Sequence, residues 1–187
     1  MEKIRKKSVE AGFWGMSMPE EVGGGGVNVL TRAIVGEHLA NRLPGFHQGI
    51  FGGAGGPTLT LMECDERQRE KYLDPLMNGE KTTCFALTEP EHGSDPQYMN
   101  TTAEKDGDEW VINGSKYWIS NGPYADFAKV FARTSGEDGD YHGITCFLVD
   151  ADNSGYGVER IHRTRHRVAR SFEGIDKLFA QFFWVSI

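Results

Sequence analysis

The 187-residue sequence lacks a long hydrophobic run, has only three cysteines and carries no excess of positive charge. No stretch approaches the roughly 20 apolar residues of a transmembrane helix, so we expect no membrane span. The formal net charge of −7 argues against a surface built to bind nucleic acid. Cys64, Cys84 and Cys146 lie far apart and lack metal-ligand spacing, so we expect reduced thiols and no metal site.

The first residues, Met1 to Lys7, are basic but lead into no apolar segment. A secretory signal peptide needs such a segment, so we predict a cytoplasmic protein, with the mitochondrial matrix as the alternative in a eukaryote. Hydrophobic residues make up 39% of the chain and charged residues 25%, which is typical of a globular protein with a buried core.

Residues 1–80 have a helical pattern. Asn28 is placed to cap one helix, and Asp65 is placed to cap a second, charged helix that ends near Gly79. The segment between them, residues 44–64, is rich in small and apolar residues and is compatible with a buried helix interrupted by glycines. In the second helix we expect three side chains to face inward: Tyr72, Leu73 and Leu76.

Residues 81–163 have a pattern of short β-prone runs separated by turn residues. Asn113-Gly114, between two such runs, predicts a tight hairpin. Regular turn signals without strand–helix alternation predict an antiparallel β-sandwich or barrel, and therefore an α+β protein. Residues 164–187 fit neither pattern, and we treat them as a separate tail.

Two segments offer side chains for ligand binding. In the run from Phe85 to Asp95, an apolar strand ends in hydroxyl residues, a proline turn and Gly-Ser-Asp, which could line a planar heterocycle. The same residues also fit a plain β-turn capped by Asp95. In the second segment, strand alternation would put Trp118 and Ser120 on one face, either as a stacking ring with a donor or as a core tryptophan beside a surface serine.

Both segments belong to a longer pattern. Gly12-Phe13-Trp14 is followed by Pro19-Glu20-Glu21-Val22-Gly23-Gly24 in the helical part. The run Phe85 to Asp95 contains Thr-Glu-Pro-x-x-Gly-Ser-Asp, and Trp118-Ile119-Ser120-Asn121 follows at matching spacing. Over about residues 9–160 the sequence resembles the acyl-CoA dehydrogenase family.

This resemblance implies an FAD site. The implied flavin-contacting residues are Phe85, Leu87, Thr88, Gly93, Ser94, Trp118, Ile119 and Ser120. Trp118 would cover the isoalloxazine, Ser120 would donate toward its N5–O4 edge, and Ser94 would also lie near the acyl-CoA thioester arm. The family usually has Gly-Ala where this chain has Glu91-His92, so larger side chains are expected to alter the approach of the ligand.

The reaction implied by the resemblance is FAD-dependent α,β-dehydrogenation of an acyl-CoA thioester, with electrons passed to an electron-transfer flavoprotein. In the family the base is a glutamate of a C-terminal helical domain, which has no match here. We therefore predict a truncated form that lacks the catalytic residue and is inactive alone, and we assign neither Glu89 nor Glu91 as the base. Full-length members are expected to form homo-oligomers.

Two alternatives stay open. One is an acyl-CoA oxidase-like flavoenzyme, in which oxygen accepts the electrons from the reduced flavin. The other is a non-catalytic remnant that binds flavin or CoA weakly or not at all.

Overall fold

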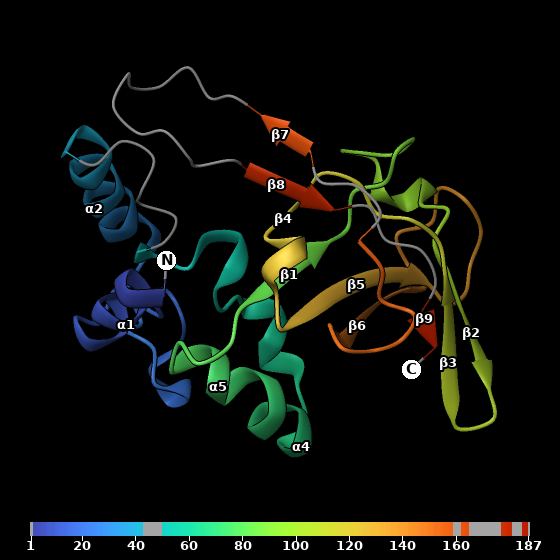
Figure 1. Cartoon of the computed structure of the whole chain (residues 1–187), viewed down its shortest axis with the longest axis horizontal. Helices are drawn as coiled ribbons and strands as arrows, with labels where there is room; N and C mark the ends of the chain where they lie inside the picture. Colours follow the sequence, from blue (N-terminus) through green and yellow to red (C-terminus); the bar gives the residue numbers. More distant parts are fainter. Residues whose placement is uncertain (1, 43–49, 159–161, 165–176, 181–184, 187) are drawn as a thin grey trace. The chain divides into compact units, whose positions relative to one another are not determined.

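The computed structural model describes residues 2–42, 50–158, 162–164, 177–180 and 185–186. These residues form two compact units: one of helices, up to Thr82, and one of strands, from Thr83 onward (Figure 1). Helices first and strands second confirm the predicted α+β class. The domain division at residues 80 and 163 stays a prediction, because compactness alone does not show which segments fold independently.

The helical unit contains α-helices joined by short 3₁₀ turns. Its described elements are α1 (Glu2–Glu10), η1 (Glu20–Val22), α2 (Val29–Arg42), η2 (Gly53–Gly55), η3 (Leu59–Glu63), α4 (Glu66–Gln68), the π-helical turn η4 (Arg69–Leu73) and α5 (Asp74–Met77). As predicted, Asn28 caps α2: its Oδ1 accepts from the Thr31 amide at 2.9 Å. In the segment 44–64, residues 44–49 lie outside the described residues, and the rest contains the turns η2 and η3.

The helical run from α4 to α5 begins and ends as the sequence predicts. Asp65 forms a capping box with Gln68, in which the Gln68 amide donates to the Asp65 carboxylate at 2.7 Å. Pro75 has no N–H to offer the Lys71 carbonyl, which instead accepts from Lys81 Nζ at 2.9 Å. The run stops before Gly79, whose φ is +69°.

The core of the helical unit includes the residues predicted to face inward. Tyr72, Leu73 and Leu76 are all buried. Trp14 is buried with them, and its Nε1 donates to the Leu76 carbonyl at 2.7 Å. A tryptophan N–H that is removed from water needs such a partner, and this bond joins the start of the unit to its last helix.

The strand unit contains two sheets. The larger has the strand order β1-β5-β2-β3-β9, with β6 on β5; the smaller has the order β4-β8-β7. The strands are β1 (Thr83–Ala86), β2 (Thr102–Asp106), β3 (Glu109–Asn113), β4 (Ile119–Ser120), β5 (Phe127–Arg133), β6 (Ile144–Asp150), β7 (His162–Thr164), β8 (Lys177–Ala180) and β9 (Val185–Ser186). Two 3₁₀ turns, η5 (Pro96–Tyr98) and η6 (Gly122–Tyr124), lie between strands.

The larger sheet is mixed. β1 pairs with β5 in parallel, from Thr83 opposite Phe127 to Ala86 opposite Val130. β2 also meets β5 in parallel, whereas β2–β3, β3–β9 and β5–β6 are antiparallel. The parallel pair forms because the chain leaves β1, builds the β2–β3 hairpin and β4, and only then returns as β5. The described strands of the predicted tail, β8 and β9, pair with β4 and β3.

The predicted Asn113-Gly114 hairpin is wrong. β3 folds back on β2 instead, through a turn at Gly107, whose φ is +62°. After Gly114 the chain moves away from β3, and the other edge of β3 pairs with β9. Gly114 has a φ of +154°, and a Cβ there would lie 2.7 Å from the Thr101 Cα, closer than atoms can pack. Close backbone approach, and not a hairpin turn, therefore requires this glycine.

Candidate functional site

The turn that follows β1 is shaped by its own polar groups. The Glu89 amide donates to the His92 carbonyl at 2.9 Å, and the Gly93 amide donates to the Asp95 carboxylate at 2.9 Å. His92 Nδ1 lies 3.4 Å from the Asp95 carboxylate, and this contact is the largest cause that holds the pKa of Asp95 below its ordinary value. Gly93 and Ser94 are left exposed, and a Cβ at Gly93 would meet nothing within 4 Å. We call residues 87–95 the signature turn.

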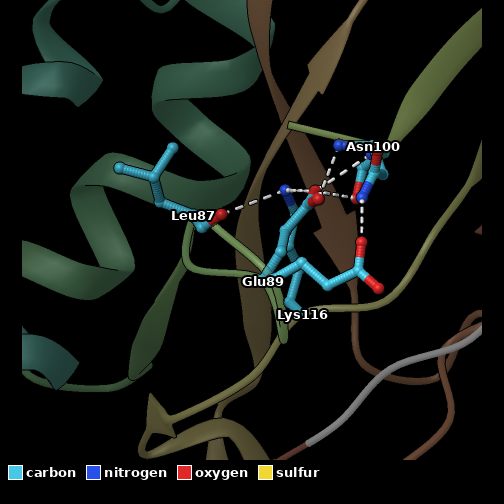
Figure 2. Close-up of polar contacts among 6 residues, drawn as sticks. Leu87, Glu89, Asn100 and Lys116 are labelled. Atoms are coloured by element: carbon cyan, nitrogen blue, oxygen red, sulfur yellow. Dashed lines mark hydrogen bonds and ion pairs between the residues drawn. The ribbon is translucent and has the colours of Figure 1, made fainter. Parts of the chain in front are cut away.

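A buried ion pair joins Glu89 of the signature turn to Lys116 (Figure 2). Lys116 Nζ donates to Glu89 Oε1 at 2.7 Å and to the Leu87 carbonyl at 3.1 Å. The side chains of Glu89 and Lys116 are each only 2% exposed. The Glu89 carboxylate also accepts from the Asn100 amide at 2.6 Å, from the Thr101 amide at 3.0 Å and from the Thr101 hydroxyl. A buried carboxylate is therefore satisfied by four donors.

The two members of the pair keep opposite charges. Burial alone would raise the pKa of Glu89, but the hydrogen bond and charge of Lys116, with Thr101 and Asn100, hold that pKa below its ordinary value. Burial lowers the pKa of Lys116, and Glu89 opposes this shift. The ionised carboxylate is thus the stable form in this site, which suits a structural anchor better than a proton acceptor.

The second predicted segment, residues 117–120, lies beside the signature turn, and we call it the Trp118 segment. The Tyr117 amide donates to the Thr88 carbonyl at 2.8 Å, so the residues before β4 run next to the signature turn. Trp118 is 46% exposed and has a φ of +58°, which is unfavourable for a bulky residue. Ile119 is buried and Ser120 is half-buried.

One sequence argument about this segment is wrong. Strand alternation was expected to put Trp118 and Ser120 on one face, but β4 contains only Ile119 and Ser120. Trp118 precedes the strand in the left-handed region, so the alternation rule does not apply to it.

Phe85 lies on β1 and is 38% exposed, whereas its neighbours Cys84 and Ala86 are buried. Its ring centroid lies 4.7 Å from that of Phe131 on β5. Lys129 Nζ lies 5.5 Å from the Phe85 ring centroid, within the range of a cation–π contact. The structure thus leaves Phe85 and Trp118 as exposed aromatic rings on the two segments.

Lys129 is a further buried lysine in the described part of the strand unit, and it was not singled out from the sequence. Its side chain is fully buried on β5, and burial lowers its pKa to about 8, opposed by Cys146 and Cys84. Burial raises the pKa of Cys84 to about 12. A lysine inside the apolar run Phe127–Arg133 was the signal that could have marked this position.

The eight predicted flavin-contacting residues fall on two segments that the structure brings together through Thr88 and Tyr117. Sequence reasoning missed what supports them: Lys116, Asn100 and Thr101. Each of these lies 11 or more residues from Glu89, so no local motif connects them. Within the described residues, no helix is long and apolar enough for a bilayer, and no cluster of metal-binding side chains is found.

Two family models match the chain in succession. The model described as the acyl-CoA dehydrogenase N-terminal domain matches residues 1–80, and the model of the acyl-CoA dehydrogenase middle domain matches residues 84–176. The chain is similar to a 3-(aryl)acrylate reductase of Clostridium sporogenes, with 39% identity over 155 residues. It is also similar to the caffeyl-CoA reductase-Etf complex subunit CarC of Acetobacterium woodii, with 37% identity over 161 residues.

The matched part is most of this chain but less than half of each relative. The two alignments cover 82% and 84% of this chain, and 41% of each relative. Among solved structures, the chain resembles a glutaryl-CoA dehydrogenase from Mycobacterium smegmatis in complex with FADH2. That likeness has a TM-score of 0.73 and 27% identity, and it covers 99% of this chain and 46% of the other. Sequence and fold therefore agree, and the chain belongs to the acyl-CoA dehydrogenase family.

Proposed function

We propose that this chain supplies the flavin-contacting part of an enzyme that oxidises an acyl-CoA thioester between its α and β carbons. The observation that carries the proposal is the hydrogen bond from the Tyr117 amide to the Thr88 carbonyl. It joins the two segments that bear the eight flavin-contacting residues expected from the sequence. The glutaryl-CoA dehydrogenase with a similar fold binds FADH2, which supports a flavin here.

The residues present suit such a cofactor. Trp118 and Phe85 offer exposed aromatic rings, and Ser94 and Ser120 offer hydroxyl groups. Space is open above Gly93, where a side chain would meet no atom within 4 Å. Aromatic rings together with hydroxyl donors match a planar heterocycle that has a polar edge.

The proposed roles follow from these side chains. FAD, when bound, accepts a hydride from the β carbon of the thioester. In the proposal Trp118 stacks on the ring system and the Ser120 hydroxyl donates to its edge. Phe85, Leu87, Thr88 and Ile119 line the flavin, and the turn residues Gly93 and Ser94 allow its close approach. Ser94 would also lie beside the thioester arm.

We do not assign the base that removes the α proton to Glu89. Its carboxylate accepts four hydrogen bonds, and the pKa is below its ordinary value because of Lys116, Thr101 and Asn100, despite the opposing effect of burial. Such a group is a poor proton acceptor. We propose that the base belongs to a part of the enzyme other than the residues described.

An electron-transfer flavoprotein is the proposed electron acceptor, because one relative is a subunit of a reductase-Etf complex. Both relatives are named as reductases, of a 3-(aryl)acrylate and of caffeyl-CoA, which favours a second candidate: reduction of an α,β-unsaturated thioester at the same bond. In an enzyme completed by the part that supplies the base, faster anaerobic turnover of an enoyl-CoA than of the saturated acyl-CoA would favour reduction. Rapid reoxidation by oxygen would instead favour an oxidase.

The first test is a titration of the purified 187-residue chain with FAD, followed by flavin absorbance and fluorescence. We expect saturable binding that weakens about tenfold in Trp118→Ala, because a stacking contact is lost. Tyr141→Ala is the matched control, since Tyr141 is an exposed aromatic residue outside the two segments. A folded chain that binds no FAD would contradict the proposal.

A further inference from the structure

The Glu89 carboxylate joins three parts of the strand unit that are distant in sequence. It belongs to the signature turn, accepts hydrogen bonds from the Asn100 and Thr101 amides just before β2, and pairs with Lys116 before β4. Figure 2 shows these donors converging on the carboxylate. These bonds connect the three parts to one another. Removing either charge would be costly, because it would leave the other charge buried without its partner.

The residues that this ion pair holds are close in sequence to the exposed candidate ligand contacts. Glu89 lies four residues before Gly93, and Lys116 lies two residues before Trp118. The Lys116 ammonium also binds the Leu87 carbonyl at 3.1 Å, directly before Thr88. Each exposed segment is therefore next in sequence to one member of the buried Glu89–Lys116 pair.

The spacing of the backbone fits this arrangement. Gly114 packs closely against Thr101, which brings the chain near enough for Lys116 to reach Glu89. The Thr88–Tyr117 hydrogen bond then fixes the two segments to each other. An exposed Trp118 with a positive φ needs such support, because the surrounding bonds must hold a conformation that the residue alone disfavours.

We propose that Glu89 and Lys116 are positioning residues, whose buried ion pair sets the spacing between the signature turn and the Trp118 segment and so sets the affinity for FAD. This inference rests on the proposed function. It concerns residues that support the site without touching the cofactor, and it distinguishes Glu89 from a catalytic carboxylate.

The test uses the full chain and the double variant Glu89→Gln/Lys116→Met. Removing both charges avoids a single unpaired buried ion, so this variant is designed to fold where Lys116→Met alone can fail. Glu104→Gln/Lys105→Met on exposed positions of β2 is the matched control. Folded fractions are first measured by urea unfolding, and the readouts below refer to folded protein only.

Two readouts separate positioning from general stability. By hydrogen exchange, we expect the Tyr117 amide to exchange about tenfold faster in the double variant, while amides in the middle of β5 keep their protection. By titration, we expect FAD to bind about tenfold more weakly, with less quenching of flavin fluorescence. The control variant is expected to match wild type in both.

Each other outcome has a definite meaning. Unchanged exchange at Tyr117, or unchanged FAD affinity, in the folded double variant would overturn the positioning role while leaving the proposed function intact. If the folded wild-type chain binds no FAD, the proposed function fails, and the positioning role fails with it.

Discussion

Among the residues whose burial the structure describes, the strand unit buries two lysines, Lys116 and Lys129, and their surroundings differ. Lys116 lies against a carboxylate at 2.7 Å and a backbone carbonyl at 3.1 Å. Lys129 lies under an aromatic ring, near the thiols of Cys84 and Cys146. Burial lowers the pKa of both amines, but Glu89 opposes the shift at Lys116, whereas the pKa of Lys129 falls to about 8.

The difference shows what a buried cation needs. A carboxylate with its own hydrogen-bond donors can offset much of the desolvation cost, and the resulting pair then anchors the backbone around it. At Lys129 the effect of burial outweighs the opposing effect of Cys146 and Cys84, so the amine releases its proton more easily. The Glu89–Lys116 pair is expected to stabilise the fold at neutral pH, whereas the charge of Lys129 is expected to reduce its stability.

The largest effect is expected from removing one member of the pair. Lys116→Met leaves the Glu89 carboxylate buried without its cation, and we expect a loss of about 3–5 kcal/mol in the free energy of unfolding by urea at pH 7. Lys105→Met on β2 is exposed and should change stability by less than about 0.5 kcal/mol. A loss for Lys116→Met as small as the one for Lys105→Met would show that the Glu89–Lys116 pair does not stabilise the fold.

Removing the other buried lysine should have the opposite sign. Lys129→Met deletes a cation whose pKa falls from 10.5 to about 8, and we expect a gain of up to about 3 kcal/mol at pH 7. In wild type, the unfolded chain holds this proton until about pH 10.5 while the folded chain releases it near pH 8. Stability should therefore rise with pH in this window.

The Lys129 pH effect is best read between pH 8 and 9. Above pH 9 the Cys84 thiol acts in the other direction, because its pKa is raised to about 12 in the folded chain. The difference between wild type and Lys129→Met removes the Cys84 contribution except for the part due to Lys129, whose charge lowers the pKa of that thiol. A wild-type curve that falls between pH 8 and 9, parallel to the variant, would contradict the assignment.

A third change tests whether backbone spacing supports Lys116. Gly114→Ala puts a Cβ against Thr101 at a positive φ, and we expect a loss of about 1–3 kcal/mol by thermal or urea unfolding. Gly107→Ala is the control, because Gly107 also has a positive φ but a Cβ added there would meet no atom within 4 Å. The control carries only the backbone strain, so equal losses would mean that contact with Thr101 is unimportant.

The smallest effect concerns the aromatic partner of Lys129. Phe85→Leu removes the cation–π contact, and we expect a loss of about 0.5–1 kcal/mol with a further fall in the pKa of Lys129. The measurement is the midpoint of the stability rise above pH 8, compared with Phe131→Leu, which keeps the Phe85 ring. An unchanged midpoint in Phe85→Leu would show that the ring does not stabilise the cation.

Much of the fold was predictable because its signals are local. The Asp65 capping box joins residues three positions apart, and the apolar faces of the helices repeat at short intervals. The hairpin prediction at Asn113-Gly114 failed because the same glycine also serves close packing, here against Thr101. A sequence pattern cannot separate these two uses when the packing partner is distant in the chain.

The candidate site also combines local features that the sequence predicts with distant contacts that it does not. The turn after β1 and the Trp118 segment were visible as short motifs, although their flavin contacts stay a prediction. The ion pair between Glu89 and Lys116 spans 27 residues and depends on how the strands pair, so the sequence alone did not reveal it. Both partners looked like ordinary charged residues, which are usually exposed.

The parallel pairing of β1 with β5 has a consequence for the order of folding. Thr83 meets Phe127, 44 residues later, whereas β2 and β3 are joined by a turn of a few residues. Closing a long loop costs more chain entropy before any contact forms, so the β2–β3 hairpin should form early and the β1–β5 pair late. The turn after β1 would then take its final shape near the end of folding. Substitutions in β1 should accordingly accelerate unfolding more than they slow folding.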